Sequence, residues 1–418
     1  MGQQQLSYIK SFDGMRGVFA LCVITAHWSL DLPILPIGWE GLQIFFVLSG
    51  FLITRILLNE REKPAYRPEG QFGGFMKQFM LKRVFRIFPL YFSYVLLMYA
   101  LRYGLGDMKF IQNQTAELEV NGIWLLTYLY NFKDVLNHLL GWPMAESPFF
   151  THLWSLAVEE QFYVFFPFII YFVRGRALKV TIVAMIVIPF VTRIFGYPYL
   201  AAIAEANHYG HDWAILNIYR NFFFQFDSLA IGAAAAIFDV SKIKNVRVWF
   251  FVVLALIVGS YAYNGYLMMQ VVYDNTDHIA SIFKTGNSMS ILGYINILGH
   301  PEMLTFNHQY IYVFSLVNLA GFFMVACSVQ RKTVFKFLFE SKVFVYLGKI
   351  SYGTYVFHFA FMQFFLFLAK KFAFVPPSGH MYPVQVLYFL IYLGFLYGLA
   401  HLSFKYFEMF FLNLKKKI

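Results

Sequence analysis

Long apolar stretches, separated by polar connections, recur along the whole chain. About 20 consecutive apolar residues cross a bilayer as a helix, and ten stretches come close to that length. They lie near residues 12–30, 38–58, 84–103, 153–173, 178–195, 216–238, 248–267, 310–328, 343–369 and 384–412. The pattern predicts an all-α polytopic membrane protein, a bundle of about ten transmembrane helices.

The stretch 121–140 breaks this pattern. It is fairly apolar but is interrupted by polar and charged side chains, namely Asn131, Lys133, Asp134, Asn137 and His138. Because such groups are costly in lipid, we expect a re-entrant or interfacial element there. We find no internal repeat of the kind common in secondary transporters, and we treat 1–418 as a single membrane domain.

Lys and Arg gather in alternate connections. The segment 55–86 carries eight of them, and cytoplasmic loops are the ones rich in these residues. Alternation from there places both termini in the cytoplasm and the long segments 104–151 and 264–309 on the outer side. Lys370 and Lys371 are the one exception.

Composition agrees with a membrane protein, since 59% of the residues are hydrophobic and only 13% are charged. The formal net charge of +11 comes from residues between apolar stretches, and no soluble domain is apparent, so we expect no nucleic-acid partner. The two cysteines, Cys22 and Cys327, stand alone and indicate neither a zinc site nor a disulfide framework.

The first apolar stretch carries two ionisable residues, Arg16 and His27, that are eleven positions apart. In a helix this spacing is three turns plus ~20° and ~16 Å of rise, so both side chains lie on one face. Intramembrane ionisable groups are functional candidates. A plainer reading is also open, in which Arg16 extends to the interface and His27 caps a loop.

A second pair of cations, Arg83 and Arg86, opens the third stretch at the cytoplasmic depth of Arg16. Residues three apart share a helical face, and the planar guanidinium suits phosphate or carboxylate. Ordinary cytoplasmic anchoring is the alternative.

The start of the stretch near 153 holds a dense polar cluster. His152 and Glu159 are seven residues, or about two turns, apart and share a face, and Glu160 adds a second carboxylate. Two adjacent carboxylates in a bilayer segment are costly unless they are neutralised, paired or hydrated. Pairing with an arginine of a neighbouring helix would explain one of them.

Two further stretches contain ionisable groups. Asp227 is placed to be a counter-ion for Arg16 or Lys349, and His358 is either functional or a hydrogen-bonded histidine of the bundle interior. The histidines and glutamates lack metal-site spacings such as H-E-x-x-H, so no metal is predicted.

Together these motifs resemble the membrane acyltransferase-3 family, in order and over nearly the whole chain. The resemblance rests on five segments: 12–17 with His27, 41–53, 83–89, 152–163, and 347–353 with His358. It implies ten spanning helices in the bacterial cytoplasmic (inner) membrane. It also implies acetyl-coenzyme A or another acyl-CoA as donor, and O-acylation of an envelope or exported carbohydrate or a lipid-linked glycan.

Position by position, the arginine and histidine of the family fall on Arg16 and His27, and its cytoplasmic arginine pair falls on Arg83 and Arg86. The sequence departs from the family pattern at Gln43, Gln225 and Met409. Some relatives carry an additional C-terminal SGNH esterase-like domain. This chain ends at Ile418, so we expect transfer to finish in the membrane domain or on a separate downstream transferase.

Acyl transfer from a thioester to a hydroxyl needs a base, a donor for the oxyanion and an anion site for coenzyme A. We expect Arg16, Arg83 and Arg86 to hold a phosphate of the donor and His27, which titrates in the useful range, to act near the thioester. His152 or Glu159 would orient His27 or receive the acceptor hydroxyl. The other functional candidates are Glu160, Tyr163, Asp227, Lys349, Tyr355 and His358.

A carrier or flippase that moves a glycan or anionic substrate without covalent chemistry is the alternative, because charges inside an aromatic-rich bundle suit that role equally. Transfer of label from acetyl-CoA to a glycan would separate the two. A signalling receptor is less favoured, since no output domain is recognisable.

Overall fold

The computed structural model describes residues 8–28, 38–66, 71–105, 108–210, 212–274, 308–372 and 382–415. Every regular element in these ranges is a helix, which confirms the predicted all-α class. Eight helical segments are long and apolar enough to cross a membrane: Gly38–Arg61 (α2), Phe72–Gly104 (α3), Thr151–Phe172 (η3 and α7), Gly175–Ala206 (α8), Val246–Leu267 (in α11), Gln309–Val329 (α14), Ser351–Lys371 (α17) and Val384–Leu414 (α18 to α19).

Two of the ten expected spans are helical but fall short of that standard. α1 (Lys10–His27) has 18 residues and carries Lys10, Asp13 and Arg16. The stretch near 216–238 divides at Asn221 into α9 (Trp213–Arg220) and α10 (Phe222–Ile237), because the Asn221 side chain accepts a hydrogen bond from the Phe223 amide and begins a new helix.

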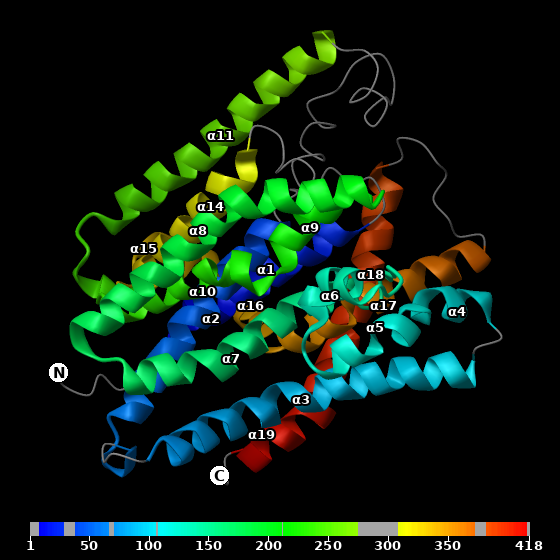
Figure 1. The fold of residues 1–418 in the computed structure, drawn as a ribbon. Helices are drawn as coiled ribbons and strands as arrows, with labels where there is room; N and C mark the ends of the chain where they lie inside the picture. Colours follow the sequence, from blue (N-terminus) through cyan, green and yellow to red (C-terminus); the bar gives the residue numbers. More distant parts are fainter. Residues whose placement is uncertain are drawn as a thin grey trace.

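The helices α1, α2 and α10 lie at the centre of the bundle (Figure 1). The close approach of α2 and α10 requires glycine at two positions. A Cβ atom at Gly50 would lie 2.0 Å from the Leu229 carbonyl oxygen, and one at Gly232 would lie 2.0 Å from that of Val47. Because neither glycine carries a side chain, the two backbones approach closely at these points, which holds α2 and α10 in one register.

The segment around 121–140 does not form a spanning helix. It contains the end of α5 (Glu117–Leu126), a 3₁₀ turn at Tyr130–Phe132 (η2) and α6 (Lys133–Leu140), which follow α4 (Lys109–Thr115). None of these pieces reaches bilayer length, in agreement with the expected re-entrant or interfacial element. Most of the other long connection, 264–309, lies outside the described residues.

The remaining elements are short or complete the C-terminal half. They are η1 (Pro64–Tyr66), η4 (Val240–Lys242), α11 (Val246–Asp274), α15 (Thr333–Phe339), α16 (Lys342–Lys349), α18 (Tyr382–Leu402), a π-helical turn at Ser403–Glu408 and α19 (Met409–Lys415). α16 packs against α1, and α17 packs against α18 and α3.

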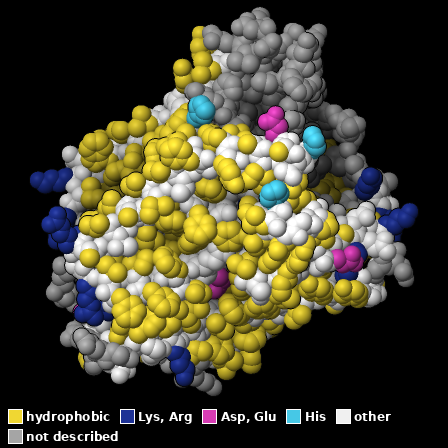
Figure 2. Space-filling view, viewed as in Figure 1, with side chains coloured by type: hydrophobic (Ala, Val, Ile, Leu, Met, Phe, Trp, Pro, Cys, Tyr) yellow, Lys and Arg dark blue, Asp and Glu magenta, His cyan; other side chains and the backbone are white. Residues whose placement is uncertain are grey.

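The surface carries a broad apolar band, as lipid contact requires. Figure 2 shows apolar side chains across the face in view, and the visible Lys and Arg side chains lie towards its left, lower and right edges. Large exposed apolar residues occur along α8, α11 and α18, for example Phe195, Val258 and Phe395. In water such a surface would be unstable, so it identifies the protein as embedded in a membrane.

Candidate functional site

A cavity of about 310 Å³ lies among α1, α2, α3, α7 and α17. These helices also carry most of the candidate residues. Its polar lining consists of Arg16, Ser49, Arg83, Arg86, Ser155, Glu159, Ser351 and the hydroxyl-bearing rings of Tyr163, Tyr352 and Tyr355. The rest of the wall is apolar and comes mainly from α2.

The three arginines that we expected to act together do line this one cavity. Arg83 is only 7% exposed, and its guanidinium lies over the rings of Phe79 and Tyr163 at 5.4 and 5.6 Å. Among the described residues, no carboxylate forms an ion pair with it. Arg16 has Asp13 at 3.5 Å, and Arg86 is exposed.

Glu159 is the single carboxylate among the lining residues. Its Oε1 accepts a hydrogen bond from Ser49 at 2.5 Å, and its Oε2 accepts one from Tyr163 at 3.4 Å. The cavity therefore holds three guanidinium groups against one carboxylate. This excess of positive charge favours an anionic ligand.

Glu160 is not part of the cavity lining. Its side chain is 4% exposed, and its Oε1 has no hydrogen-bond partner in the described part of the chain. Adjacent helical residues point about 100° apart, which explains why the two glutamates separate.

Three histidines from different parts of the sequence meet beyond one end of the cavity. His27 Nδ1 lies 3.0 Å from His358 Nε2, and the rings of His152 and His358 are 4.7 Å apart, edge to face. His152 and His358 are buried, whereas His27 is half-buried. None of the three lines the cavity itself.

Tyr355 and Ser155 connect the cavity to this histidine cluster. Their hydroxyl oxygens are hydrogen-bonded at 2.7 Å, and both line the cavity. The Tyr355 hydroxyl also donates to the His152 carbonyl oxygen at 3.0 Å, and its ring lies 5.3 Å from that of His358. A ligand in the cavity would therefore reach these hydroxyls before it reached an imidazole.

Two expected partnerships are not found. The side chain hydrogen-bonded to His27 is His358. Glu159 instead accepts hydrogen bonds from Ser49 and Tyr163. The Nε2 of His152 is hydrogen-bonded to the Val356 carbonyl oxygen at 3.0 Å. Sequence spacing described single helices, but the partner of His27 comes from α17, which packs against α1 only in the folded bundle.

Asp227 was expected to pair with Arg16 or Lys349, and this expectation is wrong. It forms an ion pair with Arg193 of α8 at 2.7 Å, and both side chains are almost fully buried. Lys349 is exposed at the end of α16. Arg193 is the single cation inside an apolar stretch of the sequence. Because a buried charge needs a counter-ion, this residue was the sequence signal for the ion pair with Asp227.

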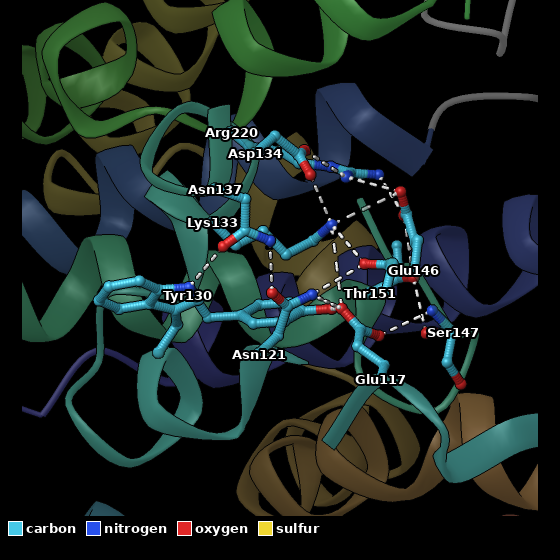
Figure 3. A network of polar contacts seen from close by, with 12 residues as sticks. Glu117, Asn121, Tyr130, Lys133, Asp134, Asn137, Glu146, Ser147, Thr151 and Arg220 are labelled. Atoms are coloured by element: carbon cyan, nitrogen blue, oxygen red, sulfur yellow. Dashed lines mark hydrogen bonds and ion pairs between the residues drawn. The ribbon is translucent and has the colours of Figure 1, made fainter. Parts of the chain in front are cut away.

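A second polar cluster, which sequence reasoning missed, lies beside the entrance to α7 (Figure 3). Arg220 of α9 contacts Glu146 at 2.7 Å, and Lys133 contacts Asp134 at 2.7 Å. Glu146 also accepts a hydrogen bond from Thr151, the residue before His152. We call these charged residues, with Glu117, the α9 network.

The charges of the α9 network shift the pKa of its member Glu146. Partial burial acts to raise the pKa of Glu146, but the charges of Arg220 and Lys133 outweigh it and hold that pKa at about 2. Glu117 accepts hydrogen bonds from the Tyr130 hydroxyl at 2.6 Å and the Ser147 amide at 2.7 Å. The network thus ties α5, α6 and α9 to the turn that presents His152.

No group of three or more His, Cys, Asp or Glu side chains suited to a metal ion occurs within the described ranges.

Fold and site together define a helical membrane protein with a cation-rich cavity next to buried histidines. The chain matches the family model for the acyltransferase domain over residues 9–404, and it belongs to the acyltransferase-3 family.

Two relatives illustrate the likeness. The chain is 26% identical over 362 residues to a protein of Staphylococcus aureus (strain COL) named "Putative O-acetyltransferase", covering 86% of this chain and 52% of that protein. It is 32% identical over 170 residues to the peptidoglycan O-acetyltransferase OatA of Listeria monocytogenes, and the match covers 40% of this chain and 25% of that protein. The chain spans about half the length, or less, of these curated relatives. No solved structure matches it.

Proposed function

We propose that the protein is an integral membrane O-acyltransferase, which moves an acetyl or other acyl group from cytoplasmic acyl-CoA to a hydroxyl of an envelope carbohydrate. The observation that carries this proposal is the convergence of Arg16, Arg83 and Arg86 on a cavity whose far end meets a histidine cluster. Family membership and the O-acetyltransferase names of relatives support the reaction class.

The arginine end of the cavity suits the phosphates of acyl-CoA. Guanidinium groups bind phosphate oxygens through charge-assisted hydrogen bonds, often two at once. Arg83 forms no ion pair with a carboxylate among the described residues, so a ligand phosphate would supply a directly bonded counter-charge. The apolar wall from α2 would then contact the pantetheine arm.

The histidine end suits the transfer step. His27 would accept the proton of the acceptor hydroxyl while the hydroxyl oxygen bonds to the thioester carbonyl carbon. The Tyr355 hydroxyl would stabilise the oxyanion by turning its hydrogen away from the His152 carbonyl oxygen. When the carbon–sulfur bond breaks, His27 returns the proton to the thiolate of coenzyme A. The products are then an ester and free coenzyme A.

The charge pattern supports an orientation in the bacterial cytoplasmic membrane. The segment 55–86 and both termini would face the cytoplasm, where acyl-CoA occurs, and 104–151 would face the acceptor. A carbohydrate or lipid-linked glycan would therefore approach from the outer side. A separate downstream transferase remains part of the proposal for glycans that the membrane domain does not reach.

Ester-linked acetate on envelope glycans tests the proposal. Cells with the wild-type protein should carry more of it than cells without, and His27→Ala should return the level to that of cells without the protein. His401→Ala is the matched control, because His401 is exposed and hydrogen-bonded to Tyr346 away from the cavity lining. An inserted His27→Ala protein with wild-type acetylation would remove His27 from the reaction, and a glycan transported without any acetyl-CoA requirement would favour a carrier.

A further inference from the structure

The imidazole of His358 lies between a backbone carbonyl group and the imidazole of His27. Its Nδ1 is 2.5 Å from the Tyr355 carbonyl oxygen, and its Nε2 is 3.0 Å from His27 Nδ1. The side chain is fully buried, so water does not compete for either nitrogen. Both ring nitrogens of His358 therefore have assigned partners.

The carbonyl group decides which nitrogen of His358 carries hydrogen. A carbonyl oxygen only accepts hydrogen bonds, so His358 Nδ1 must be protonated and must donate to Tyr355. A neutral imidazole has one N–H group, and the Nε2 of His358 is then a bare acceptor. No other tautomer satisfies the contact with Tyr355.

The contact with His358 also decides which ring nitrogen of His27 carries hydrogen. A contact of 3.0 Å between two ring nitrogens is a hydrogen bond only if one of them carries hydrogen. Since Nε2 of His358 is bare, His27 Nδ1 must be the donor. Neutral His27 then has its lone pair on Nε2, the nitrogen that points away from His358.

We propose that His358 is a positioning residue that fixes the tautomer of His27, with its lone pair on Nε2 as the base. This inference rests on the proposed function for its use in catalysis. His358 holds the place that a carboxylate holds behind the histidine of a serine-protease triad, where the second group sets tautomer and orientation. After His27 Nε2 takes a proton, Nδ1–H still donates to His358, and the pair carries one positive charge in total.

His152 does not perform this task, although its ring is close. Its Nε2 donates to the Val356 carbonyl oxygen at 3.0 Å, and its Nδ1 has no hydrogen-bond partner in the described part of the chain. Consecutive carbonyl groups of α17, those of Tyr355 and Val356, thus anchor two imidazoles, but only His358 passes a restraint on to His27.

Two substitutions of His358 separate the tautomer role from simple packing. His358→Gln places an amide oxygen near the former Nε2 and so keeps an acceptor for His27. His358→Phe keeps a ring of similar size and removes the acceptor. His152→Phe is the matched control, since it alters a neighbouring ring without touching the contact between His27 and His358.

The first readout is ¹⁵N NMR of the imidazole of His27 in the purified protein, assigned by the signal that His27→Asn removes. We expect the Nδ1–H tautomer in the wild type, in His358→Gln and in His152→Phe, and a mixture or the Nε2–H tautomer in His358→Phe. An Nε2–H tautomer in the wild type, or an unchanged tautomer in His358→Phe, would overturn the inference.

The second readout is acetyl transfer. When His27 becomes cationic, its hydrogen bond to His358 is charge-assisted, so we expect His358→Phe to lower kcat roughly 10- to 100-fold with an unchanged KM for acetyl-CoA. His358→Gln should recover most of it, because it restores the acceptor. Equal loss in both variants would contradict the inference. A wild type without any transfer would refute the proposed function alone, because the NMR result does not depend on it.

Discussion

Replacing Arg83 by Met should weaken the binding of acyl-CoA without lowering the stability of the protein. Arg83 is 7% exposed, stacks on Phe79 and Tyr163, and has no carboxylate partner among the described residues. A charge-assisted hydrogen bond contributes about 1.5–3 kcal/mol, so its loss should raise the Kd for acetyl-CoA roughly 10- to 100-fold. The replacement breaks no ion pair among the described residues, and Met retains the contact with both rings.

The assay combines calorimetric titration of acetyl-CoA with the Tm of the purified protein. Lys82→Met is the matched control, because it removes one charge from the same helix, but Lys82 is paired with Glu60 at 3.0 Å and does not line the cavity. We expect Lys82→Met to keep the wild-type Kd and to have a slightly lower Tm. We expect Arg83→Met to have a raised Kd and the wild-type Tm. An unchanged Kd in Arg83→Met would show that Arg83 does not bind the donor, and a Tm below that of the control would show that its charge stabilises the fold.

Three further changes probe the fold. Asp227→Asn strands the Arg193 charge in the bundle and should cost about 3–5 kcal/mol, seen as a lower Tm that the double variant with Arg193→Met largely restores. Because its pKa is lowered, the ionised Glu146 side chain stabilises the fold at pH values above the ordinary glutamate pKa of 4.5. This stabilisation is lost as the pH falls towards 2. The stabilisation should be on the order of 1 kcal/mol after solvent screening. Thermal melts between pH 6 and pH 3 should therefore show a loss of stability in the wild type that Glu146→Gln lacks. Gly232→Ala places a Cβ 2.0 Å from a carbonyl oxygen of α2 and should cost about 1–3 kcal/mol, whereas Gly259→Ala, with open space around it, should leave the Tm unchanged or slightly raised, because Ala is the better helix former.

Most of the helices could be predicted from the sequence. Apolar length sets where a chain crosses the bilayer, and charged ends set how far each helix extends. This is why Arg16, Arg83 and Arg86, which were expected at one depth, do line one cavity.

The neighbours of each helix could not be predicted in the same way. The contacts of His27 with His358 and of Asp227 with Arg193 join α1 to α17 and α8 to α10. Periodicity within one helix identifies a face but not the helix that covers it. An isolated cation such as Arg193 shows that a partner must exist without showing which one.

The end of a helix inside an apolar run was also difficult to foresee. The stretch near 216–238 reads as one span, yet it divides at Asn221, whose side chain caps α10. Asparagine is a preferred first residue of a helix, so the signal was present. Apolar residues on both sides concealed it, because hydropathy averages over a window.

Sealed vesicles that contain the purified protein would show whether the acetyl group crosses the membrane from donor to acceptor. Acetyl-CoA with a labelled acetyl group would be supplied only on the side where the segment 55–86 is accessible to protease, and muropeptides would be trapped on the other side as the acceptor. We expect labelled ester on the trapped acceptor, and its loss in His27→Ala and Arg83→Met. Label that never reaches the acceptor, or that does so only when donor and acceptor share a side, would contradict this expectation.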